Sequence, residues 1–318
     1  MRRRDARHLI LLAVLVGSLS QARPAQAYVH AVSDAGAPLF WPTSCETVTI
    51  YLNGFTGLTS DQVVEAVAAA ARTWSPEAVT CPSGAGDGGV GHPYFEIIPS
   101  LASGGTAPGI ANDGKNSIIF QTSDWDGPSD GLAYTSHFSD SAGRILDTDI
   151  AINASNPGGS GVWADLDPGS PPSEHGIPRF DLQTALTHEF GHFLGLAHTC
   201  IGGSGSDEGS DQSPTDDQGL PVPACEPLTA ANEQAQQAVM WYEIDNDSVT
   251  KRALAPDDVR GVCGLFPPGQ SPATCSANLP DDGCGCAAAG GPGGSHAAAP
   301  TLALALGTAL LLRRRRRR

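Results

Sequence analysis

The sequence predicts an α+β domain with a mixed β-sheet and a loop-rich second half. Short apolar runs bounded by Gly, Pro or Asp recur between residues 48 and 153. Three stretches show helical signals, one before most of these runs and two after them. The order of elements is therefore strand, helix, several strands, helix, long loop, helix, which is typical of the α+β class.

Five runs are predicted as strands. Residues 48–53 alternate between apolar and polar side chains, as a strand with one buried face does. The other four are short apolar runs between turn-forming residues, at 94–98, 117–121, 132–138 and 149–153.

Two helices are predicted from caps and apolar spacing. Ser60 or Asp61 caps an alanine-rich helix that runs to Trp74. Asp181 begins a second helix that ends near Gly195.

A third helix opens at Pro256, with Asp257 and Asp258 well placed in its first turn. Residues 156–178 are predicted as loop, and residues 199–227 as an irregular acidic insert.

Both ends of the chain resemble targeting signals. Residues 1–27 contain a basic start, an apolar run at 9–19 and a small-x-small site, so a signal peptide cleaved after Ala27 is expected. The alternative is an uncleaved anchor, although the run is shorter than the ~20 residues of a spanning helix. Near the other end, an apolar segment at 297–312 and an arginine tail at 313–318 are typical of a stop-transfer anchor.

Between these signals we expect one large domain over residues 28–267, followed by a Gly/Ala/Pro-rich linker over 268–296. Residues 28–280 contain 31 Asp and Glu against 7 Lys and Arg, a net charge of 7 − 31 = −24. This charge argues against nucleic acid and against an anionic membrane surface as partners. It favours solubility outside the cell or the binding of calcium.

Six cysteines in the exported part favour disulfides, and pairing of neighbours is the simplest of about 15 connectivities. They are Cys45, Cys81, Cys200, Cys225, Cys263 and Cys275. Cys284 and Cys286 stand apart in the linker and suggest another role.

One segment carries the chemistry. His188 and His192 are four residues apart on the second helix, so both imidazoles can face one metal ion. Gly195 lets the chain turn back, and His198 can then supply a third nitrogen. Three protein ligands leave a tetrahedral zinc ion one position for water, and Glu189 can act as general base on that water. The alternative is a histidine pair at the surface or in a satisfied buried contact.

These residues resemble the signature of the metzincin metallopeptidases, HExxHxxGxxH followed by a methionine turn. Met240, within residues 238–242, matches the methionine; ordinary core packing is the alternative. Tyr242 matches a tyrosine of the astacin and serralysin branches, which touches the metal or stabilises the transition state. A core tyrosine is the other interpretation of Tyr242.

Over about residues 39–267 the chain resembles the matrixin-like branch. The similarity rests on residues 181–184, on residues 252–258 with Gly261, and on Trp74. It implies a five-stranded mixed twisted sheet with two helices, plus a smaller loop-rich C-terminal subdomain with one helix. It also implies that substrate pairs with an edge strand at residues 131–136.

The resemblance is incomplete. No cysteine-switch prodomain precedes the domain, and His137 has no partner set for the structural zinc site of the branch. Calcium is a second expected cofactor, at acidic residues of the insert or at a pair before the long loop. These are Asp207, Glu208, Asp211, Asp216 and Asp217, and the pair Asp147 and Asp149.

The tail from residue 281 resembles a myxobacterial-type sorting tail. This implies removal of the hydrophobic end by a sorting peptidase and attachment through Cys284, with a plain anchor as the alternative. In either case the protein is exported, and is secreted or displayed on the cell surface.

The function expected is a zinc-dependent endopeptidase that acts on extracellular proteins. A non-catalytic surface adhesin with the same fold is the alternative, and the intact Glu189 argues against it. A metallopeptidase with a glutamate as third ligand is a weaker interpretation, because Glu208 and Glu226 lie in loop-like sequence and His198 already fits.

Overall fold

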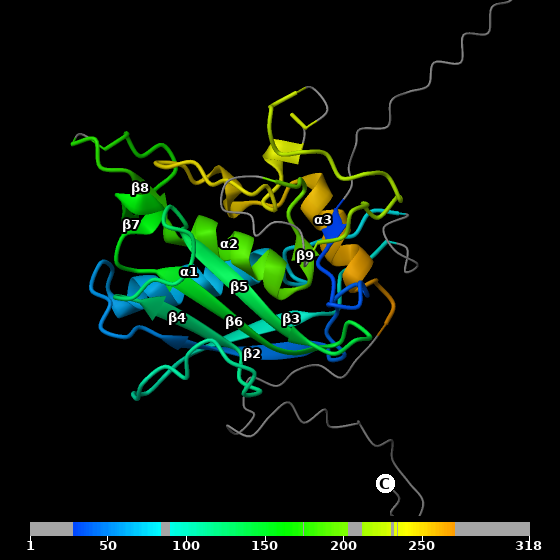
Figure 1. Ribbon diagram of the computed structural model, residues 1–318, viewed down its shortest axis with the longest axis horizontal. Helices are drawn as coiled ribbons and strands as arrows, with labels where there is room; N and C mark the ends of the chain where they lie inside the picture. The colour runs from blue at the N-terminus through cyan, green and yellow to red at the C-terminus, as the bar shows by residue number, and fades with distance from the viewer. Residues whose placement is uncertain are drawn as a thin grey trace, which may run out of the picture. The chain divides into compact units, whose positions relative to one another are not determined.

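The computed structural model describes residues 28–83, 90–173, 175–202, 212–229, 232–233 and 235–270 (Figure 1). The predicted signal peptide and everything predicted from residue 281 onward lie outside these ranges. Within them, no helix has both the length and the apolar character needed to cross a bilayer.

A five-stranded mixed sheet forms the centre, as predicted. Its order is β3-β2-β4-β6-β5; the first four strands are parallel, and β5 runs antiparallel to β6 at one edge. The strands are β2 (Cys45–Tyr51), β3 (Glu96–Leu101), β4 (Ser117–Gln121), β5 (Ala133–Ser139) and β6 (Ile145–Asn153). This α+β architecture is compatible with a metzincin-like fold.

Helices α1 (Ser60–Thr73) and α2 (Leu182–Phe193) contact each other across one face of the sheet (Figure 1). Alternate residues of the central strands, such as Val48 and Ile50, are fully buried beneath them. This burial of apolar side chains is the main stabilising term of the fold.

The N-cap of α1 is Thr59, so the predicted caps Ser60 and Asp61 are wrong by one or two residues. Thr59 forms a capping box with Gln62: its hydroxyl accepts from the Gln62 N–H, and the Gln62 side chain accepts from the Thr59 N–H. The glutamine three positions later decides which of three adjacent polar residues is the cap. Asp181 caps α2 as predicted, accepting from the Thr184 N–H at 2.9 Å.

The segment predicted as loop at 156–178 also contains ordered elements, which corrects that prediction. A 3-10 turn, η1 (Pro157–Gly159), precedes β7 (Val162–Ala164), and β7 pairs in parallel with β8 (Arg179–Asp181). Trp163 is buried there, and its indole N–H donates to the Asn153 carbonyl at 2.7 Å. Strands of three residues have no visible period, so only tertiary pairing reveals them.

The second half contains short elements and helix α3 (Pro256–Leu265). The N-terminal strand β1 (Val29–His30) pairs with β9 (Leu196–Ala197). Two 3-10 turns precede α3, namely η2 (Ala235–Gln237) and η3 (Thr250–Arg252).

Two disulfides test the predicted pairing of neighbours. Cys200 pairs with Cys225, which confirms one predicted pair. Cys81 pairs instead with Cys263 in α3, so the other two neighbour pairs are wrong. The physical reason is that α3 returns to the start of the sheet, where Phe266 stacks on Phe95 at 4.5 Å.

Candidate metal centre

Helix α2 carries two of the three histidines, and a glycine ends it. His188 and His192 lie one turn apart on α2, and Gly195 follows with φ +102°. A Cβ at Gly195 would lie 2.8 Å from the Leu39 carbonyl oxygen, so both the backbone angle and the close approach require glycine. The chain then reverses through β9 and brings His198 back to the helix.

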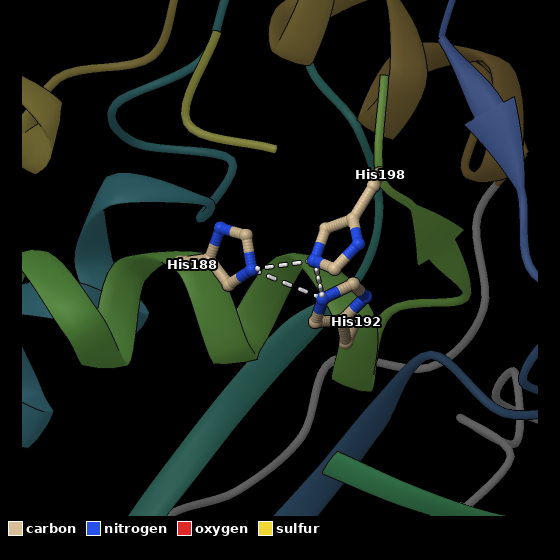
Figure 2. A group of neighbouring side chains, drawn as sticks. All are labelled: His188, His192 and His198. Atoms are coloured by element: carbon tan, nitrogen blue, oxygen red, sulfur yellow. Dashed lines mark hydrogen bonds between the residues drawn. The ribbon is translucent and has the colours of Figure 1, made fainter. Parts of the chain in front are cut away.

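The three imidazoles converge on one point (Figure 2). Their Nε2 atoms form a nearly equilateral triangle: 3.1 Å from His192 to His188, 3.1 Å from His192 to His198 and 3.2 Å from His188 to His198. In the described part of the chain, this is the one group of three or more His, Cys, Asp or Glu close enough to hold a metal ion.

Backbone carbonyls orient two of the rings. His188 donates from Nδ1 to the Val239 carbonyl at 2.7 Å, and His192 donates from Nδ1 to the Leu196 carbonyl at 2.8 Å. A proton held on Nδ1 leaves the Nε2 lone pair free and directed at the centre of the triangle.

Burial keeps all three rings neutral. Burial lowers the pKa of His188 to about 4 and that of His198 to about 3, and it lowers the pKa of His192 well below its ordinary value. Three unprotonated nitrogens at this spacing repel one another unless a cation lies between them. Ligands at about 2.1 Å from a tetrahedral zinc ion stand about 3.4 Å apart, so the triangle fits zinc.

The turn that contains Met240 lies directly beneath α2. Met240 is buried, and a Cβ at Gly191 would lie 2.0 Å from its Sδ, so only glycine fits at that position of the helix. Asp258 of α3 holds the turn by accepting from the N–H groups of Val239 at 2.8 Å and Met240 at 3.2 Å. Because the Val239 carbonyl orients His188, Asp258 acts on the histidine site through the backbone.

Glu189 faces the same cavity as the histidines. The cavity has a volume of about 360 Å³, and its lining includes the first residues of β5, the three histidines and residues 242–244. Burial raises the pKa of Glu189 to about 7, and a hydrogen bond from Thr135 partly opposes that rise. Glu189 is therefore a buried carboxylate beside the three histidines, in the place that a general base requires.

Tyr242 also lines the cavity, but its hydroxyl donates to Glu226 at 3.3 Å. Burial and the nearby Glu243 and Glu226 carboxylates raise its pKa. The predicted role of Tyr242 at the metal stays a prediction.

Other predicted site residues have different partners. His137, which has no partner set for a structural zinc site in the sequence, donates from Nε2 to the His192 carbonyl at 2.7 Å. Asp147 and Asp149 accept from backbone N–H groups of the 111–114 loop, with calcium there still a prediction. The calcium candidates Asp207, Glu208 and Asp211 lie outside the described residues.

Comparison with known proteins gives one family. A family model of the peptidase family M43, described as pregnancy-associated plasma protein-A, matches residues 179–251. The match supports a zinc metallopeptidase of metzincin type. It spans the three histidines, Glu189 and Met240, and it indicates a peptide hydrolase that acts on proteins or peptides. Comparison with curated proteins gave no significant match.

Two residues that support this centre cannot be recognised from the sequence alone. In the sequence, Asp258 is recognisable only as a favourable charge at the start of a helix. In the structure, its side chain holds the turn beneath α2. Thr135 lies inside a predicted strand, and nothing in the sequence indicates that its hydroxyl contacts Glu189. Neither contact has a local sequence signal, because each partner lies far along the chain.

Proposed function

We propose that this chain is a zinc-dependent endopeptidase that hydrolyses peptide bonds of extracellular proteins. The observation that carries the proposal is the triangle of three neutral Nε2 atoms, with Glu189 in the same cavity. The matched metallopeptidase family supports it independently.

In this proposal His188, His192 and His198 hold the zinc ion. Zinc held there would supply a Lewis acid and would lower the pKa of a bound water from ~15.7 to about 7. Glu189 accepts the proton of the attacking water and then donates it to the leaving amine. Its burial in the cavity that also holds the histidines supports this role.

The edge strand β5 suits an extended substrate. Its only neighbour in the described sheet is β6, and residues 131–135 line the cavity. We propose that the peptide pairs with this edge, main chain to main chain, so that the scissile carbonyl meets Glu189 and the histidines. Tyr242, which also lines the cavity, is proposed to support the transition state after leaving Glu226.

Export is part of the proposal. The disulfides Cys81–Cys263 and Cys200–Cys225 are typical of proteins that fold in an oxidising compartment. We propose that the chain is exported by residues 1–27 and is secreted or held at the cell surface by its C-terminal segment, with the sorting tail as the attachment device. Matrixin-like ancestry belongs to the same proposal.

The test uses the full chain, expressed in an oxidising compartment. We expect about one zinc ion per chain and cleavage of casein that a chelator stops and added zinc restores. Glu189→Ala should keep the zinc and lose at least about 10³-fold in kcat, because the proton acceptor is gone. Metal content by mass spectrometry and cleavage of a quenched casein measure the two effects.

His198→Ala is the matched control, since it should lose both zinc and cleavage. Zinc binding by a wild-type chain that cleaves no tested protein would favour the non-catalytic adhesin. Unchanged cleavage by Glu189→Ala would remove that residue from the mechanism.

A further inference from the structure

Thr135 of the edge strand lies between the proposed substrate and the proposed general base. Its side-chain hydroxyl donates to Glu189 Oε2 at 2.6 Å and lies 3.4 Å from the Glu189 carbonyl oxygen. A hydroxyl-to-carboxylate distance of 2.6 Å is typical of a charge-assisted hydrogen bond, which is stronger than a neutral one. Both residues line the cavity that holds the three histidines.

We infer that Thr135 is a positioning residue for the reaction, which holds one oxygen of Glu189 so that the other faces the attacking water. This inference rests on the proposed function, because it needs a reaction in which Glu189 accepts a proton.

The two carboxylate oxygens of Glu189 are in different situations. Oε2 accepts a hydrogen bond from Thr135. Oε1 has no hydrogen-bond partner among the described residues, and it is not fully buried, so it remains accessible from the cavity. A glutamate side chain has three rotatable bonds, and a catalytic group misplaced by 1 Å can lose about 100-fold in rate. One fixed oxygen removes most of that freedom and leaves Oε1 directed into the cavity.

Thr135 is well suited to hold a partner in place. Threonine is branched at Cβ and has few χ1 rotamers. Its backbone is fixed by the β5–β6 ladder, in which Thr135 lies opposite Ile150. The hydroxyl therefore sits at a defined point above α2, whether or not substrate is bound.

The same strand position would connect substrate binding to the base. The main chain of β5 is the proposed docking edge, whereas the Thr135 side chain points to α2. Loss of the hydroxyl should therefore leave substrate pairing intact and disturb only Glu189. A hydroxyl that merely satisfied a buried carboxylate would instead affect stability or zinc content.

The experiment compares three variants of the full chain with the wild type, using a quenched peptide substrate. Thr135→Val keeps the shape and removes the hydroxyl; we expect kcat to fall about 10- to 100-fold while KM changes less than about twofold. Thr135→Ser restores the hydroxyl and should return kcat to within about threefold of the wild type. Thr47→Val, the same change at an exposed position of β2 outside the cavity, is the matched control and should leave kcat unchanged.

Zinc content and thermal midpoint are measured on each variant, and about one zinc ion per chain is expected throughout. The inference is overturned if Thr135→Val retains wild-type kcat, if Thr135→Ser fails to restore it, or if the loss follows zinc content or KM. In each of these cases a cleaving wild type leaves the proposed endopeptidase intact. A wild type that binds zinc without cleaving removes the proposed function and this inference together.

Discussion

The two halves of the candidate centre are built in different ways. Residues 181–198 form a continuous unit of cap, helix, glycine turn and short strand, and this unit carries all three histidines. Residues 238–266 contribute no histidine, and they reach the centre through the buried turn at Met240 and the side chain of Asp258. The first half supplies the chemical groups and orients His192 through the Leu196 carbonyl, whereas the second half orients His188 through the Val239 carbonyl.

The comparison teaches that a short motif is not by itself a working site. His188 points into the triangle because the Val239 carbonyl, 51 residues away, accepts its Nδ1 proton. Within α2 itself nothing requires a glycine at position 191. The requirement comes from the second half, because a Cβ there would lie 2.0 Å from the Sδ of Met240. Substitutions in residues 238–266 should therefore change the orientation of His188 and the affinity for zinc, although they replace no histidine.

The largest effect is expected from Asp258→Ala. This change leaves the Val239, Met240 and Ala255 N–H groups without their acceptor. We expect a loss of about 3 kcal/mol in the free energy of unfolding and a 10- to 100-fold loss in zinc affinity. Urea unfolding and competition with a zinc-binding dye measure the two quantities.

The neighbouring Asp257→Ala is the control, because its carboxylate contacts neither Val239 nor Met240 among the described hydrogen bonds. Wild-type zinc affinity in Asp258→Ala would show that residues 181–198 orient their own histidines. The second half would then have no part in the metal site.

Two disulfides between described cysteines provide a second, smaller test. Cys81–Cys263 spans 182 residues and ties α3 to the start of the sheet, whereas Cys200–Cys225 spans 25 residues within the acidic insert. Loss of the longer link releases more chain entropy, so Cys81→Ser with Cys263→Ser should cost about 1–2 kcal/mol more than Cys200→Ser with Cys225→Ser. Equilibrium unfolding of both double variants measures the difference. Equal costs would mean that packing, and not the long link, holds α3 against the sheet.

The smallest expected effect concerns pH. Burial, together with the neighbouring Asp258 carboxylate, raises the pKa of Asp257 from 3.8 to about 7. Between these values the folded chain keeps a proton that the unfolded chain has lost, so the contribution of Asp257 to stability is complete below about pH 3.8 and is lost as pH rises to about 7.

Asp257→Asn removes this titration. We expect the variant to become more stable than the wild type as pH rises from about 4 to about 7, with no difference toward pH 4. Thermal midpoints measured from pH 4 to pH 8 test this. A difference in thermal midpoint that does not depend on pH would mean that burial does not raise the pKa of Asp257.

Much of the fold, and the half of the site formed by residues 181–198, could be predicted from the sequence. The runs at 117–121 and 132–138 match β4 and β5 closely, because period and turn residues are local signals. The spacing of His188, His192 and His198 predicted their convergence, since a helical turn and a left-handed glycine determine where each ring lies. The cap of α1, the strand β7 and the partner of Cys81 were predicted wrongly, because each depends on a contact that competes with a plausible local alternative.

The sequence by itself determined which groups this chain brings to its centre: three imidazoles, one carboxylate and one methionine, in an order that short-range geometry can interpret. Only the tertiary structure decided what holds them, namely the Val239 carbonyl on His188, Asp258 beneath the Met240 turn and Thr135 on Glu189. The physical reason is that hydrogen bonds between residues 18 to 54 positions apart depend on how the sheet, α2 and α3 pack together, and packing leaves no period in the sequence.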